Sequence, residues 1–220
     1  MRVLRALGTS VGTKLLLGLT GLALVGFLIF HLAGNLLLFW GPEKYNEHAH
    51  ALISNPLVIP AELGLLALFL LHAVKAGLNF VGNRAARPRG YALKKWAGGS
   101  SRKTLSSTTM IVSGVVVAVF VVVHLITFKY GPYYASPEPG VRDLYRLLVE
   151  VFQSPGYVVV YVICMLIVGM HLRHGIGSAI QSLGLMPAGL TRAVLTAGAV
   201  TAVLIAAGFM LIPIWVYLFL

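Results

Sequence analysis

Four histidines lie deep inside long apolar segments of the sequence, where an ionisable side chain is costly and usually functional. They are His31 in LIFHLAGNLLLFW, His72 in LFLLHAVKA, His124 in VFVVVHLITF and His171 in LIVGMHLRHG. A neutral imidazole is a strong iron ligand, and two imidazoles from facing helices can bracket a haem. We therefore interpret the four histidines as axial ligands of haem iron.

Depth along the apolar segments sorts these histidines into two pairs. Counted from the inner end of its own segment, His31 lies roughly 25 Å along and His124 roughly 27 Å along. The same count gives roughly 18 Å for His72 and roughly 15 Å for His171. Any one of them alone could be a polar residue that bonds to a neighbouring helix, but two matched levels favour ligation. We expect an outer haem between His31 and His124 and an inner haem between His72 and His171.

The composition indicates the class of protein that positions these residues. Hydrophobic residues make up 58% of the 220 residues and charged residues only 10%, and the mean hydropathy is +0.89. Runs of 18 or more apolar residues are long enough to cross a membrane. Five such segments are found, at approximately 14–40, 61–83, 106–128, 156–181 and 191–218. The sequence therefore predicts a single all-α domain, 1–220, that crosses a lipid membrane as a bundle of five helices.

The basic residues are distributed unevenly about these five segments. Thirteen of the 17 lysines and arginines fall on one side of a five-helix arrangement, and all six acidic residues fall on the other. The positive-inside rule then places the N-terminus in the cytoplasm and the C-terminus outside. The net charge of +11 is thus explained by membrane topology, and we expect no nucleic-acid partner.

Motifs for other redox cofactors are not found in the sequence. Cys164 is the single cysteine and is expected to be a packing residue, because an iron–sulfur cluster needs about four thiolates. There is no CxxCH for covalent haem attachment, so the haems would be b-type. No GxxxxGK[ST] or strand-borne GxGxxG is present for a nucleotide or flavin. Any chemistry that needs those groups must come from a partner.

Several polar residues near the segment ends are further candidates. Glu62 could accept a proton from a quinol at the outer side, or could be an interfacial charge at a helix N-terminus. His50, and less so His48, could line an outer ligand site or be solvated. His174 lies one turn beyond His171 and is a candidate contact for a haem propionate.

Two connecting stretches also have interpretable patterns. Apolar residues recur at helical spacing from Leu144 to Phe152, which predicts an amphipathic helix covering the outer end of the bundle. The basic stretch GNRAARPRGYALKKWAGGSSRK on the other side could dock a partner or contact lipid headgroups.

Six stretches of the sequence resemble the membrane-anchor cytochrome b of succinate:quinone oxidoreductases, in the single-chain form with five helices and two haems. They are K-x3-GLTGLALVGFLIFHLAGNLLLF, YNEHAHAL, LLHAV, VVVHLITF, DLYRLLVEVFQSPGYVVVY and GMHLRHGIGSAIQSLGL, and they cover almost the whole chain in order. The resemblance implies iron ligands at His31, His72, His124 and His171, with His174 not a ligand.

The resemblance also implies cofactors and partners. These are two haem b groups, menaquinone or another quinone as substrate, and a flavoprotein subunit and an iron–sulfur subunit at the cytoplasmic face of a bacterial-type inner membrane. Electrons from succinate would pass through the iron–sulfur subunit to quinone, so enzyme activity would belong to the complex and not to this chain alone. The sequence leaves open the reverse, fumarate-reducing direction.

Two other functions also remain open from the sequence. One is the haem-carrying anchor of a formate dehydrogenase or hydrogenase, and the other is a haem-free transporter whose buried histidines relay protons.

Overall fold

The computed structural model describes residues 9–86 and 109–220, and these residues are almost entirely helical. Most of the basic stretch, like residues 1–8, lies outside the described residues. The elements in chain order are α2 (Ser10–Leu36), η1 (Leu37–Trp40), α3 (Pro42–Ile53), α4 (Val58–Ala85), α6 (Met110–His124), η2 (Leu125–Lys129), α7 (Leu144–Phe152), α8 (Pro155–Ser182), η3 (Ala188–Leu190) and α9 (Thr191–Phe219).

Five helical segments are long and apolar enough to cross a membrane, which confirms the predicted number. They are Ser10–Trp40, Val58–Ala85, Met110–Lys129, Pro155–Ser182 and Thr191–Phe219. The first begins four residues earlier than predicted, because Thr9 caps α2 by accepting a hydrogen bond from the amide of Gly12 at 3.1 Å. The predicted start of the third segment, 106–108, lies outside the described residues.

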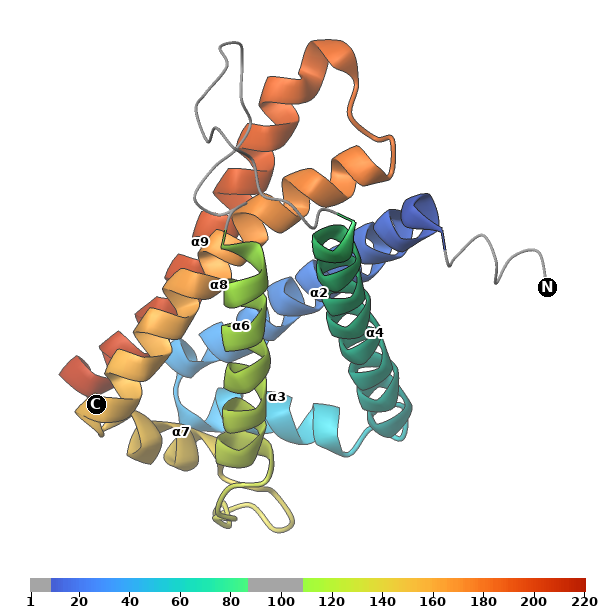
Figure 1. Ribbon diagram of the computed structural model, residues 1–220. Helices are drawn as coiled ribbons and strands as arrows, with labels where there is room; N and C mark the ends of the chain where they lie inside the picture. The colour runs from blue at the N-terminus through green and yellow to red at the C-terminus, as the bar shows by residue number, and fades with distance from the viewer. Residues whose placement is uncertain (1–8, 87–108) are drawn as a thin grey trace.

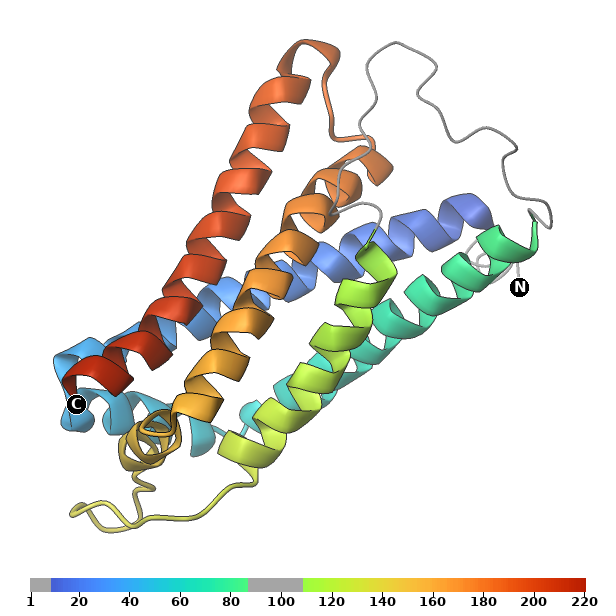
Figure 2. The same ribbon diagram turned by 60° about the vertical axis from the view of Figure 1, so that its left-hand side comes forward.

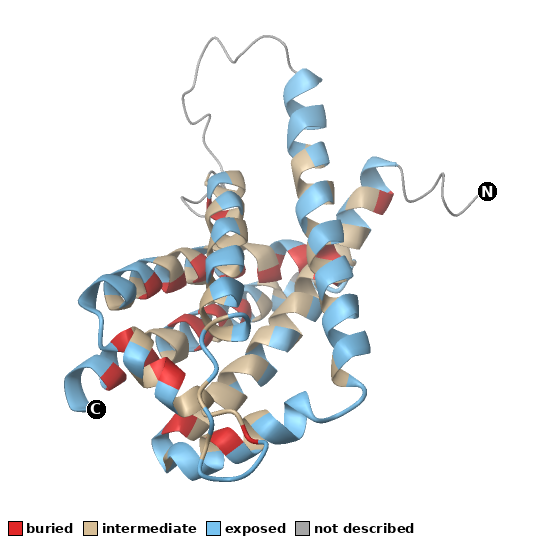
Figure 3. Cartoon of the chain, turned by 90° about the horizontal axis from the view of Figure 1, so that it is seen from below, coloured by how far each residue is buried: buried red, intermediate tan, exposed pale blue. Residues whose placement is uncertain are grey.

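Helix α8 lies at the centre of the bundle. It packs along α9, α2 and α6, whereas α4 packs mainly against α2 (Figures 1 and 2). Buried residues follow the same pattern, since α8 and α9 have several each and α4 has none (Figure 3). The remaining faces of the long helices carry exposed leucine, valine, isoleucine and phenylalanine side chains, as expected of surfaces in contact with lipid.

Close packing of α8 against α9 depends on small residues. A Cβ at Gly198 would lie 2.9 Å from Cγ2 of Ile176, and one at Gly169 would lie 2.9 Å from Cβ of Ala206. Side chains larger than hydrogen at these positions would push the two helices apart. Helix α9, which carries no histidine, therefore acts as a scaffold for α8.

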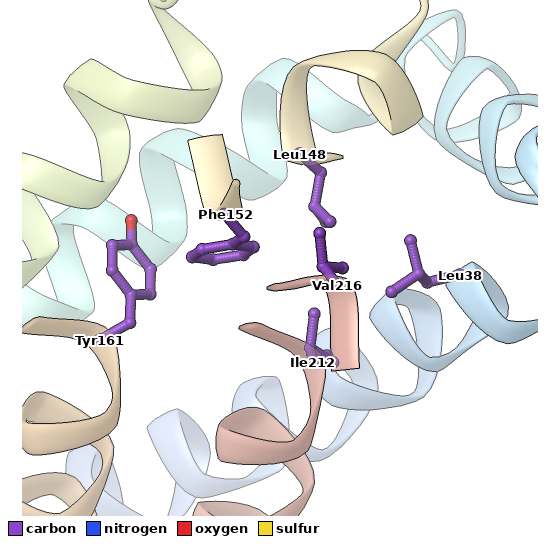
Figure 4. Packing of buried hydrophobic residues seen from close by; sticks show 6 residues of the cluster. All are labelled: Leu38, Leu148, Phe152, Tyr161, Ile212 and Val216. Carbon is purple, nitrogen blue, oxygen red and sulfur yellow. The ribbon is translucent and has the colours of Figure 1, made fainter. Parts of the chain in front are cut away.

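The short helices α3 and α7 lie at the end of the bundle where the C-terminus is found (Figure 1). The structure confirms the predicted helix Leu144–Phe152 as α7, and Asp143 caps it by accepting from the amide of Arg146 at 2.9 Å. Its apolar face completes a buried cluster at this end, shown in Figure 4: Leu38, Leu148, Phe152, Tyr161, Ile212 and Val216. The C-terminal end of α4, the start of α6 and the turn between α8 and α9 are at the opposite end, so the five spans alternate in direction.

Candidate functional site

The outer pair of histidines meets between α2 and α6. The ring centres of His31 and His124 are 5.8 Å apart, and the two ring planes are nearly perpendicular at 87°. Two metal–nitrogen bonds of about 2 Å, added to the ring radii, put the centres of two axial imidazoles roughly 6 Å apart. The observed separation fits an iron held between these rings.

Aromatic side chains surround the outer pair. Phe27 stacks on the ring of His31 at 5.3 Å and Phe120 stacks on that of His124 at 5.8 Å, and Phe209 and Phe128 lie beside the same two rings. Flat apolar rings of this kind keep water away and match the faces of a macrocycle. The surroundings of the outer pair are therefore chemically suited to haem.

The helix changes its geometry directly after His124. Residues Leu125–Lys129 form a π-helical turn, closed by a hydrogen bond from the amide of Tyr130 to the carbonyl of Leu125 at 2.9 Å. Such turns are rare and are found frequently at functional sites.

The inner histidines each contact a hydroxyl group on a neighbouring helix. His72 of α4 lies with its Nδ1 3.0 Å from Oγ1 of Thr20 on α2. His171 of α8 lies with its Nδ1 3.0 Å from Oγ of Ser113 on α6. The two inner rings are within electrostatic range of one another, although the described ring contacts do not join them as they join the outer pair.

A glycine follows each of these hydroxyl residues and lies under the same histidine ring. A Cβ at Gly21 would be 3.3 Å from Cε1 of His72, and one at Gly114 would be 3.5 Å from Cε1 of His171. The ring edges thus approach the backbones of α2 and α6 closely. Sequence reasoning missed Thr20, Gly21, Ser113 and Gly114.

A repeated pattern in the sequence could have identified them. Thr20-Gly21 precedes His31, and Ser113-Gly114 precedes His124, in both cases as [ST]-G-x9-H. Eleven residues are close to three helical turns, so hydroxyl and histidine share one helix face about 16.5 Å apart. Both α2 and α6 therefore carry one outer histidine and, at the same distance along the helix, one hydroxyl residue that contacts an inner histidine.

The outer histidines also have polar partners at Nδ1, although at longer range. The hydroxyl of Tyr161 is 3.4 Å from Nδ1 of His124. Nδ2 of Asn35 is 3.5 Å from Nδ1 of His31 and donates to the carbonyl of His31 at 2.8 Å. Tyr45 of α3 in turn donates to Oδ1 of Asn35 at 3.1 Å, and burial raises the pKa of Tyr45, which keeps its hydroxyl a donor.

Glu62 lies in the second turn of α4, half-exposed, and forms an ion pair with Lys129 at the end of η2. The structure therefore brings Glu62 to the residue that ends the π-helical turn after His124. This carboxylate is held at the same end of the bundle as the outer pair.

The structure places the other three predicted histidines in three different surroundings. His174 is half-buried one turn beyond His171 and within its electrostatic range. His50 is exposed on α3 and lines a surface pocket of about 270 Å³ with Tyr133 and Arg142. His48 lies against Gly34 of α2, where a Cβ would be 2.9 Å from its Nε2.

Cys164 lies within α8, where it packs against the buried cluster of α8 and α9. Within residues 9–86 and 109–220, no three histidine, cysteine or acidic side chains gather as a site for a bare metal ion. A haem iron needs only two protein ligands, because the porphyrin nitrogens supply the others.

Comparisons with known proteins identify no relative of this chain. No family model matches it, and neither the curated proteins nor the solved structures include a match.

Proposed function

We propose that this chain is the dihaem cytochrome b membrane anchor of a succinate dehydrogenase, which passes electrons from an iron–sulfur subunit to menaquinone or another quinone. The observation that supports it best is the arrangement of the four intramembrane histidines. They come from four different helices and form two levels, and the outer two rings are spaced to hold one iron. The resemblance of the sequence to this family supports the same proposal.

The roles of the histidines follow from their hydrogen bonds. At His72, His171 and His124 a hydroxyl lies at Nδ1, which favours Nε2 as the nitrogen for iron. His31 differs, because its contact is with the donor Nδ2 of Asn35 at 3.5 Å, which is too long to set its tautomer. His31 and His124 would hold the outer haem, and His72 and His171 the inner haem. Haem held by two imidazoles supplies one-electron redox chemistry within the membrane. The phenylalanines around the outer pair exclude water from it.

Quinone chemistry also needs a group that exchanges protons at the outer end. Glu62 is our candidate, because its carboxylate lies beside Lys129, five residues after His124. Glu62 forms an ion pair with Lys129, and it would accept a proton from a quinol bound beside it. His50 is a second candidate lining residue for the quinone, beside Arg142.

His174 is proposed to contact a propionate of the inner haem. It lies next to Arg173 and one turn nearer the end of α8 than His171. A donor in this position can pair with a carboxylate at the edge of a macrocycle.

The flavoprotein and iron–sulfur subunits would bind at the basic end of the bundle. Among the described residues, this end carries Lys14, Arg84, Arg173 and Arg192. The positive-inside rule assigns it to the cytoplasm, and the membrane would then be the inner membrane of a bacterial-type cell.

Copurification tests this function. The tagged chain, expressed with its neighbouring genes and solubilised in mild detergent, should carry a flavoprotein and an iron–sulfur protein and reduce a menaquinone analogue with succinate. The isolated chain should show haem absorption and no succinate oxidation. Copurification with formate dehydrogenase or hydrogenase subunits, or a haem-free protein, would overturn the proposal in favour of the corresponding alternative.

A further inference from the structure

Thr20 and Ser113 make equivalent contacts with the two inner histidines. Each hydroxyl oxygen lies 3.0 Å from the Nδ1 of its histidine, and both side chains are buried, with 7% of Thr20 and 5% of Ser113 exposed. Buried hydroxyls of this kind must direct their single hydrogen to one acceptor.

That acceptor is a backbone carbonyl in both helices. Thr20 donates to the carbonyl of Leu16 at 2.7 Å, and Ser113 donates to the carbonyl of Met110 at 2.9 Å. With its hydrogen committed, each hydroxyl oxygen can only accept a hydrogen bond from the histidine. The shorter contacts to the carbonyls therefore favour the tautomer of His72 and His171 that carries its hydrogen on Nδ1.

This arrangement leaves the lone pair on Nε2, which is the form of neutral imidazole that can bind a metal through Nε2. His72 also forms a hydrogen bond with the backbone of Leu17, whose carbonyl is again only an acceptor for the ring. Gly21 and Gly114 complete each contact by allowing the ring edge to approach the helix backbone.

The outer histidines are held differently. The partner of His31 is an amide nitrogen at 3.5 Å, and the partner of His124 is a tyrosine hydroxyl at 3.4 Å. Among the intramembrane histidines that the structure describes, only the inner pair has hydroxyl oxygens at 3.0 Å from Nδ1. Each of these hydroxyls also donates its hydrogen to a backbone carbonyl.

We propose that Thr20 and Ser113 are positioning residues that hold His72 and His171 in the ligating form and lower the reduction potential of the inner haem. The inference rests on the proposed function, since it assigns these hydroxyls to a haem site. A hydrogen bond from Nδ1 makes Nε2 more basic, and a more basic ligand favours ferric over ferrous iron.

The variants Thr20→Val and Ser113→Ala remove the hydroxyl acceptors and replace them with apolar side chains of similar size. Thr201→Val is a matched control, because Thr201 donates to the carbonyl of Ala197 at 3.0 Å in the same way but lies on α9. Thr20→Ser keeps the hydroxyl and should retain the wild-type midpoint potential of the inner haem. Redox titration followed by low-temperature spectra and electron paramagnetic resonance would separate the two haems in the assembled complex.

In each variant that lacks the acceptor, the ratio of the ferric to the ferrous binding constant of the haem should fall by about tenfold. This change raises the midpoint potential of the inner haem by about 59 mV. Loss of the inner haem alone would support the same role. An unchanged or lowered inner potential, or an equal shift in Thr201→Val or Thr20→Ser, would overturn the inference while leaving the two-haem proposal intact. A wild-type complex without two haems would instead overturn the proposed function itself.

Discussion

A histidine inside a membrane needs a partner for each ring nitrogen, because the bilayer core has no water to form hydrogen bonds with it. In this chain the described partners of the four intramembrane histidines lie at Nδ1, from Thr20, Ser113, Asn35 and Tyr161. Hydroxyl partners leave Nε2 to be satisfied at His72, His171 and His124, whereas the partner of His31 is the donor Nδ2 of Asn35 at 3.5 Å. A haem iron between each pair would bind all four rings, which is why we favour ligands over packing residues.

Replacing one member of a pair should disturb one haem only. We expect His31→Ala and His124→Ala to remove or alter the outer haem, and His72→Ala and His171→Ala the inner haem. Spectra recorded during redox titration would tell the two apart. His174→Ala is the control and should keep both irons six-coordinate. Loss of the same haem from His31→Ala and His72→Ala, with the other intact, would contradict the pairing.

The proposed role of Glu62 predicts a defect in quinone chemistry alone. Glu62→Gln removes the proton acceptor and should slow succinate-dependent quinone reduction by roughly 100-fold, as is typical for loss of a general acid or base. Haem content should not change. Glu47→Gln is a fair comparison, because Glu47 also pairs with a lysine, Lys44, at 2.8 Å on the neighbouring helix α3. Equal turnover in both variants would remove Glu62 from the mechanism.

At the scale of the helices, the spacing of apolar residues along the sequence predicted the five long helices and α7. The amphipathic helix was predicted from apolar residues that recur between Leu144 and Phe152, and turn residues flank it. Asp143, which the pattern put on the polar face of this helix, is its N-cap. Helix α3 was not assigned, since residues Pro42–Ile53 have no strong apolar periodicity and α3 is held by contacts with other elements. The pairing of α3 with α7 depends on residues about a hundred positions apart, which no local pattern encodes.

Asn46 makes that pairing. It is 5% exposed, donates to Oδ1 of Asp143 at 2.8 Å and accepts from the amide of Tyr145 at 3.0 Å. Asn46→Ala would leave that amide without its acceptor, and we expect a loss of about 1–3 kcal/mol in the free energy of unfolding. Thermal unfolding in detergent and hydrogen exchange of α7 would measure it.

Asn55→Ala provides the comparison for this prediction. Asn55 accepts from the amide of Leu57 at 2.9 Å, but it does so within one exposed turn. Its loss should leave the stability of α7 unchanged. An equally small effect of both substitutions would show that Asn46 does not hold α3 and α7 together.

At the scale of the whole molecule, the five spans form a bundle in which α2 and α6 each contribute to both histidine levels. The sequence predicts two levels from the regular helical rise, because depth depends only on counting residues. The contacts of Thr20 and Ser113 were not predicted, because a hydroxyl in an apolar helix usually bonds to its own backbone. Their histidine contacts depend on which helices become neighbours, since α4 packs on α2 and α6 packs on α8.

The distribution of basic residues predicts the orientation of this bundle. A reporter that is active only outside the cytoplasm should work when fused after Leu220 and fail when fused before Met1. A cytoplasmic reporter should give the opposite result. Activity of the outside reporter at the N-terminus would contradict the orientation and would place the proposed partner subunits on the wrong side.

We propose that four histidines on four helices hold two haems. The most direct measurement is the number of haems per polypeptide in the complex purified in detergent, from a pyridine haemochrome assay and quantitative amino-acid analysis. The two-haem arrangement predicts a ratio close to two, with b-type spectra and no covalently attached haem. A ratio near one or near zero would contradict it.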